Sequence, residues 1–103
     1  MILRRRFADV IGHQLDMFVE ESGGLIANCE EAEEAYDRAP RDDAEERYGD
    51  YADLVETGTE ALAQIRHQYA ATLEEDLAEE YREAFNRSVL KRLPRFALEI
   101  EDH

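Results

Sequence analysis

Two groups of metal-ligating side chains recur at helical spacing in this 103-residue chain. One group precedes the glycine pair at 23–24, and its members are Asp9, His13, Asp16 and Glu20. The other lies in the middle of the chain, and its members are Glu56, Glu60, Gln64 and His67. Steps of three and four place each group on one side of a helix, which is how helical bundles assemble metal sites. The pattern gives one hypothesis, a divalent-metal site in a dimeric bundle with His13, Asp16, Glu20, Glu60 and His67 as ligands.

The competing interpretation is that these side chains face solvent. Both groups lie opposite the apolar faces of their predicted helices, and the paired Glu-x-x-His motif of di-metal carboxylate bundles is absent. A closed site would therefore need a second copy of the chain to bury those faces.

The sequence contains no complete set of residues for nucleophilic catalysis or for a phosphate-binding loop. Cys29, the one cysteine, falls on an apolar helical face, and neighbouring acids would raise the pKa of a thiol there. Neither Ser22 nor Ser88 has a histidine partner in the predicted register, and Gly23-Gly24 lacks the lysine and preceding strand of a phosphate loop. We therefore expect no catalytic residues.

The elements that position these residues are predicted to be three helices. Apolar or small residues at steps of three and four favour a first helix over 2–38, with a kink at the Ser22-Gly23-Gly24 sequence, residues 22–24. A second helix is predicted over 43–71, since its apolar face alternates steps of four and three like a coiled coil. A shorter third helix over 73–93 ends before Pro94.

The tail, residues 94–103, carries apolar residues at alternate positions. Phe96, Leu98 and Ile100 have the spacing of a strand, which predicts an extended segment. Such a segment either seals the helices of its own chain or of a dimer partner, or docks on another protein.

The short connection at Pro40 predicts an antiparallel hairpin of the first two helices. The third helix is too short to reach the turn, so Tyr36, Tyr48 and Tyr51 are left near it without cover except the tail. The fold class is therefore all-α: a long hairpin, a shorter third helix and an extended tail in one domain over 1–103, expected to pair as a homodimer.

The net charge of the chain argues against some classes of function. The chain has 26 Asp and Glu against 12 Lys and Arg, a formal net charge of −14. This acidity argues against binding nucleic acid or an anionic membrane. No apolar run approaches the ~20 residues of a membrane span, and the single cysteine gives no sign of an oxidising compartment, so a cytoplasmic protein is expected. Eleven arginines against one lysine fit either a high-GC genome or adaptation to high salt.

The sequence thus favours a non-enzymatic interaction or assembly protein without cofactor, which acts through a coiled-coil-like helical surface and an apolar tail and engages a basic protein. The candidate interaction residues are Glu30, Glu31, Glu33, Glu34, Tyr36, Tyr48, Tyr51, Phe96, Leu98 and Ile100. The metal-binding bundle is the alternative, and an acidic nucleic-acid mimic that occupies a basic protein is a further one.

Overall fold

The computed structural model describes residues 6–103, which form five α-helices and two short 3-10 turns without any strand. The helices are α1 (Ala8–Glu21), α2 (Gly23–Arg38), α3 (Ala44–Ala70), α4 (Glu75–Arg92) and α5 (Ala97–Ile100). The 3-10 turns are Arg41–Asp43, which precedes α3, and Pro94–Phe96, which precedes α5. The predicted all-α class is confirmed.

The predicted first helix is divided at Ser22 into α1 and α2. Ser22 departs from helical geometry with φ −109° and ψ 21°, while its amide still donates to the Phe18 carbonyl at 2.8 Å and its carbonyl accepts from Ile26 at 3.0 Å. The amides of Gly23, Gly24 and Leu25 do not continue the ladder to α1, so the chain changes direction at a break in the helical hydrogen bonds. This is the position at which the glycine pair predicted a kink.

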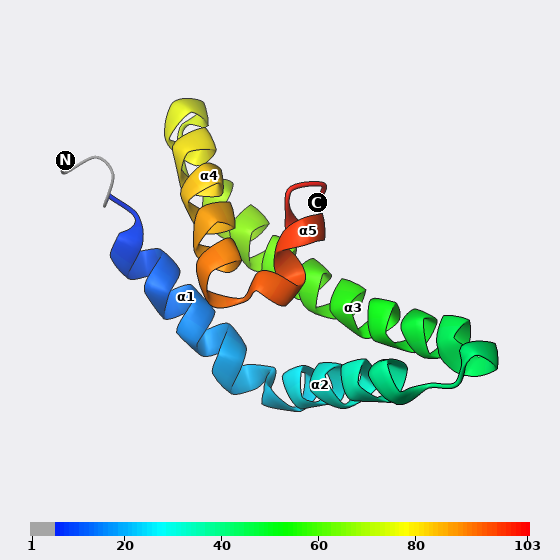
Figure 1. Cartoon of the computed structure of the whole chain (residues 1–103). Coiled ribbons are helices and arrows are strands. Elements are labelled where there is room, and N and C mark those ends of the chain that lie inside the picture. Colours follow the sequence, from blue (N-terminus) through cyan, green and yellow to red (C-terminus); the bar gives the residue numbers. More distant parts are fainter. Residues whose placement is uncertain (1–5) are drawn as a thin grey trace.

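The change of direction separates α1 from α2 in what they contact. Figure 1 shows α2 and the first half of α3 side by side, extending away from α4 and α5. The helix α1 instead packs on α4. The molecule is accordingly elongated, 51 × 24 × 23 Å.

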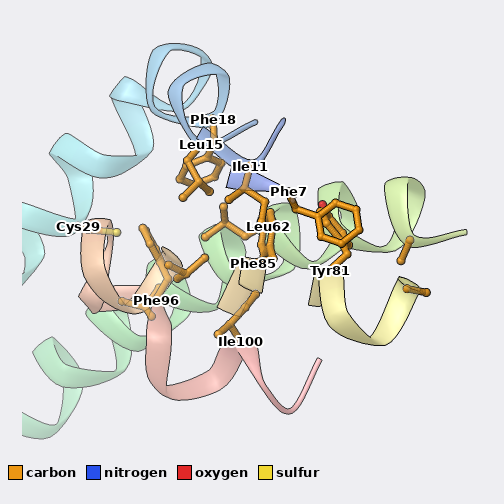
Figure 2. Packing of buried hydrophobic residues seen from close by; sticks show 14 residues of the cluster. Phe7, Ile11, Leu15, Phe18, Cys29, Leu62, Tyr81, Phe85, Phe96 and Ile100 are labelled. Carbon is orange, nitrogen blue, oxygen red and sulfur yellow. The ribbon is translucent and has the colours of Figure 1, made fainter. Parts of the chain in front are cut away.

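The core lies where α1, α4, α5 and the second half of α3 meet (Figure 2). Its fully buried side chains include Leu15, Leu62, Tyr81 and Phe85. The predicted apolar faces supply most of these residues, because a face that contacts the core must repeat at the helical period.

The predicted extended tail is wrong. Residues 94–100 are helical, and Phe96 and Ile100 are each 1% exposed, whereas Leu98 is 90% exposed. Residues four apart lie on one helical face and a residue midway between them lies on the other, so the same spacing that suggested a strand also fits one helical turn. The tail completes the core of its own chain.

Phe96 fills a notch at Gly58 on α3. A Cβ atom at Gly58 would lie only 2.8 Å from Cζ of Phe96, so a side chain there would displace the ring. The Phe96 ring also meets the Phe18 ring of α1 edge-on, with ring centroids 5.8 Å apart. Phe96 therefore packs between α1 and α3.

Candidate functional site

The outer part of the helical pair α2–α3 is a region without a core. We call residues 30–54 the hairpin arm and the remaining described residues the core end. No residue of the hairpin arm is buried, and small side chains such as Ala32, Ala35 and Ala52 are only half-buried. Alanine between two helices permits close approach but covers little apolar surface. The two helices of the arm are thus held together by a narrow contact of small side chains, and most of the arm's side chains are exposed and available to a partner.

Three tyrosines form a chain of rings along the hairpin arm. Tyr36 of α2 meets Tyr48 of α3 with ring centroids 5.5 Å apart, and Tyr48 lies 6.5 Å from Tyr51 one turn later. Tyr36 is 39% exposed and Tyr48 54%, whereas Tyr51 is half-buried. The predicted lack of cover at the turn therefore holds for Tyr36 and Tyr48, while Tyr51 is covered from the tail.

The cover on Tyr51 is Arg95. Its guanidinium lies over the Tyr51 ring, 5.9 Å from the centroid, and its Nε donates to the Tyr51 hydroxyl at 3.2 Å. Nη2 donates to Oε1 of Glu33 on α2 at 2.8 Å. Burial alone lowers the pKa of Arg95, but the hydrogen bonds to Tyr51 and Glu33 outweigh it and raise the pKa. The arginine therefore stays charged in this half-buried position.

Carboxylates dominate the rest of the arm. Residues 30–54 contain eleven Asp and Glu against three Arg. Glu33, Glu34 and Asp50 lie within 4.0 Å of an arginine, and the other eight carboxylates, including Glu30 and Glu31, pair with no basic group among residues 6–103. The surface is consequently one of unneutralised negative charge.

Cys29 lies at the inner end of the arm and is fully buried. Burial raises the pKa of its thiol; the Arg95 charge lowers it, while Glu30 and Glu33 raise it. The cysteine is therefore a small apolar side chain of the core and not an activated nucleophile.

The predicted tail residues fall on two sides. Phe96 and Ile100 contact the core of their own chain, so in this conformation Leu98 is the one of the three that reaches the surface. Leu98 shares a shallow pocket between α4 and α5 with Leu90, Pro94 and Ala97. Leu90 is 62% exposed. Leu98 was a predicted interaction residue, but Leu90 was not. The third helix was predicted from an apolar face that does not include Leu90: Leu77, Tyr81, Phe85, Val89 (or Ser88) and Leu93.

The predicted metal ligands are not assembled into one site within the described chain. His13, Asp16 and Glu20 are exposed on α1, where Oδ1 of Asp16 accepts a 2.8 Å hydrogen bond from Nη2 of Arg92. Glu60 and His67 are exposed on α3. Among residues 6–103, one group of three possible ligands has its atoms within 4.8 Å of one another, and it consists of Glu56, Glu60 and His103. Glu60 is the one predicted ligand in that group.

Arg66 is a buried residue that sequence reasoning missed. It is 4% exposed, and Nη1 donates to Oδ1 of Asn86 at 2.7 Å and to the Ile100 carbonyl at 2.9 Å. Burial, and next the charge of Arg82, lower the pKa of Arg66. Its position next to the predicted apolar face was the available signal. The hydrogen bond to Ile100 shows that this arginine anchors α5.

Comparison with protein-family models, with curated proteins and with solved structures finds no match. None of the helices in residues 6–103 is both long enough and apolar enough to span a membrane.

Proposed function

We propose that this protein is a small, non-enzymatic interaction or assembly protein that binds a basic segment of a partner protein on its hairpin arm. The observation that carries the proposal is the coincidence of exposure and charge in residues 30–54. None of these residues is buried, and eight of the eleven carboxylates have no ion pair among residues 6–103.

A physical argument supports this assignment. Like charges held close together repel, so a dense acidic arm lowers the stability of the free protein. A basic partner removes that repulsion and is attracted over distances of about the Debye length, roughly 10 Å in 0.1 M salt. The exposed rings of Tyr36 and Tyr48 add apolar contact area at the same place.

The test compares two variants with the same change of charge. The arm variant carries Glu30→Gln, Glu31→Gln, Glu45→Gln and Glu46→Gln. The control variant carries Glu20→Gln, Glu21→Gln, Asp76→Asn and Glu79→Gln at exposed positions of α1 and α4 that also lack an ion pair in the described chain. Binding of a fluorescent peptide of mixed Arg and Lys is measured in about 0.15 M salt.

The arm variant is expected to bind the peptide roughly tenfold more weakly, and the control variant within about twofold of the wild type. Equal weakening of the two variants would mean that attraction is spread over the whole acidic surface, and the proposal would then be abandoned.

The assembly part of the proposal is a homodimer formed through the apolar surface of Leu90 and Leu98. Glu83, Arg87 and Glu101 line the same pocket, so two copies related by a twofold axis can place Arg87 of one copy against acids of the other. We expect native mass spectrometry to give a dimer for the wild type and a monomer for the variant Leu90→Asp, Leu98→Asp. A wild-type monomer at all concentrations would exclude this interface.

Divalent-metal binding is a second candidate function, favoured by the group Glu56, Glu60 and His103. Nδ1 of His103 lies 2.9 Å from the Glu99 carbonyl, a contact that leaves Nε2 for a metal ion. Addition of Zn²⁺ or Mn²⁺ would then raise the melting temperature of the wild type and of His13→Ala, but not of His103→Ala. An unchanged melting temperature for the wild type would dispose of this alternative.

A further inference from the structure

We propose that the hairpin arm recognises arginine side chains of its partner, which it holds on the exposed rings of Tyr36 and Tyr48. The inference rests on the proposed function. It names the chemistry by which the arm would distinguish an arginine-rich segment from a lysine-rich segment of the same charge.

The chain already contains one example of this recognition. Arg95 reaches the hairpin arm from the tail and makes three contacts there: the face of Tyr51, the Tyr51 hydroxyl and the Glu33 carboxylate. Its side chain is only 23% exposed. On this pair of helices, a ring from α3 and a carboxylate from α2 are the groups that contact the guanidinium.

One turn further out, α3 repeats the tyrosine of the Arg95 site, and α2 carries a second tyrosine in place of the glutamate. Tyr48 precedes Tyr51 by three residues on α3, and Tyr36 follows Glu33 by three residues on α2. Because residues three apart lie on the same side of a helix, the ring chain continues from Tyr51 to Tyr48 and across to Tyr36. The rings that continue the chain are exposed, whereas Tyr51 already carries an arginine.

Carboxylates accompany the exposed rings. Glu45 precedes Tyr48 by one helical turn, and Asp37 is adjacent to Tyr36 in the sequence. Neither carboxylate has an ion pair among residues 6–103. The outer turns thus present a tyrosine face with acids nearby, as at Arg95, and among residues 6–103 no guanidinium lies over the Tyr36 or Tyr48 ring.

Arginine fits this surface better than lysine for a physical reason. A guanidinium is planar and weakly hydrated, so it can stack on a ring and at the same time donate several hydrogen bonds in its plane. An ammonium is a compact and strongly hydrated charge that gains little from a flat ring at an exposed site. The acids attract both residues, whereas the rings favour arginine.

The experiment measures the affinity of the full chain for hexa-arginine and for hexa-lysine by fluorescence anisotropy, in about 0.15 M salt. Two double variants are compared with the wild type. Tyr36→Leu with Tyr48→Leu removes both ring faces and keeps apolar bulk, while Tyr36→Phe with Tyr48→Phe keeps the faces. Circular dichroism establishes that each variant is folded.

The wild type is expected to bind hexa-arginine roughly twofold to fivefold more tightly than hexa-lysine for each ring engaged. The leucine variant should bind both peptides equally, with an unchanged affinity for hexa-lysine, and the phenylalanine variant should keep the preference. Equal binding of the two peptides by the wild type, or a preference that survives in the leucine variant, would overturn the inference.

These outcomes differ from those that would end the proposed function. If the wild type binds hexa-lysine and the arm variant with four glutamines does not, the basic partner stands whatever the peptide preference is. If neither peptide binds, both proposals fall together.

Discussion

The core end and the hairpin arm share one helix, α3, but its two halves do different things. In the second half, Leu62 and Thr59 are fully buried, Arg66 is 4% exposed, and side chains from α1, α4 and α5 surround them. In the first half, from Ala44 to Leu54, no residue is buried, and Figure 1 shows α2 alongside it. A single unbroken helix therefore joins the core end, where its side chains are buried, to the hairpin arm, where none are.

The difference in burial indicates that the two regions contribute differently to the stability of the fold and to the surface offered to a partner. Burial of apolar area supplies most of the free energy of folding, so the core end holds the fold. The arm adds little buried area and concentrates repelling carboxylates, so it lowers stability while it presents charge and aromatic rings. Regions with few buried contacts also open most readily. An arm that costs stability and has no buried residue is what the proposed binding of a basic partner would use.

The largest effect is expected from a pair of aromatic truncations, one in each region. Phe96→Ala removes a ring that is 1% exposed and fills the Gly58 notch, so it should lower the free energy of unfolding by about 3–5 kcal/mol. Tyr48→Ala, at a ring that is 54% exposed, should lower it by less than about 1 kcal/mol. Urea denaturation measures both values, and equal losses would contradict the division into two regions.

Alkaline pH offers a test of the core end alone. Burial raises the pKa of Tyr81 to about 12. Because the folded-state pKa lies above the ordinary value near 10, this tyrosine's contribution is complete below pH ~10 and is lost as pH rises toward 12. The loss should reach about 2 kcal/mol in chemical denaturation.

Tyr81→Phe should be less stable than the wild type at neutral pH, by about 1 kcal/mol, because Gln14 loses its hydrogen-bond donor. The same variant should lose less stability than the wild type between pH 10 and 12. Parallel pH profiles for the two proteins would show that Tyr81 is not the group responsible.

A glycine pair on α3 sharpens the comparison further. Gly58→Ala inserts a Cβ against the Phe96 ring in the core end, and overpacking of this kind costs about 1–3 kcal/mol, more than the helical preference of alanine returns. Gly49→Ala meets no atom within 4 Å in the arm, so it should stabilise the helix by about 1 kcal/mol. Thermal melts should therefore shift in opposite directions, and a shift in the same direction for both would contradict the structure.

The smallest effect concerns salt. Salt screens the repulsion between the unpaired arm carboxylates, so the melting temperature should rise as salt increases from about 0.02 M to 1 M. The corresponding gain in the free energy of unfolding should be less than about 1 kcal/mol. This dependence should be weaker in the arm variant with four glutamines than in the control variant on α1 and α4. Equal dependence in the two variants would assign the repulsion to the whole surface and favour general adaptation to salt.

The sequence predicted the helical class and most of the core because apolar periodicity records which face of a helix is covered. Ile11, Leu15 and Phe18 recur at steps of four and three in the predicted first helix, and all three are buried, as is Leu62 on the apolar face of the predicted second helix. Comparison of helix lengths also predicted that Tyr36 and Tyr48 would lack cover near the turn. Both inferences depend on repeating patterns over many residues, which is where sequence reasoning is strongest.

Short segments and single polar residues were beyond that reasoning. Seven residues of tail are too few to distinguish alternation from one helical turn, so Phe96 and Ile100 were placed on an extended segment. An arginine is expected at the surface, and only the tertiary partners Asn86 and Ile100 make the buried position of Arg66 possible. Contacts between distant segments decided both cases.

Amide hydrogen exchange on the full chain, with and without a mixed Arg and Lys peptide, tests the central claim most directly. The account predicts that amides of residues 34–50 in the hairpin arm exchange far faster than amides of residues 58–69 in the core end of α3. It also predicts that the peptide slows exchange in the hairpin arm alone. Uniform protection along α3, or peptide protection that is as strong on α4 as on the arm, would contradict the account.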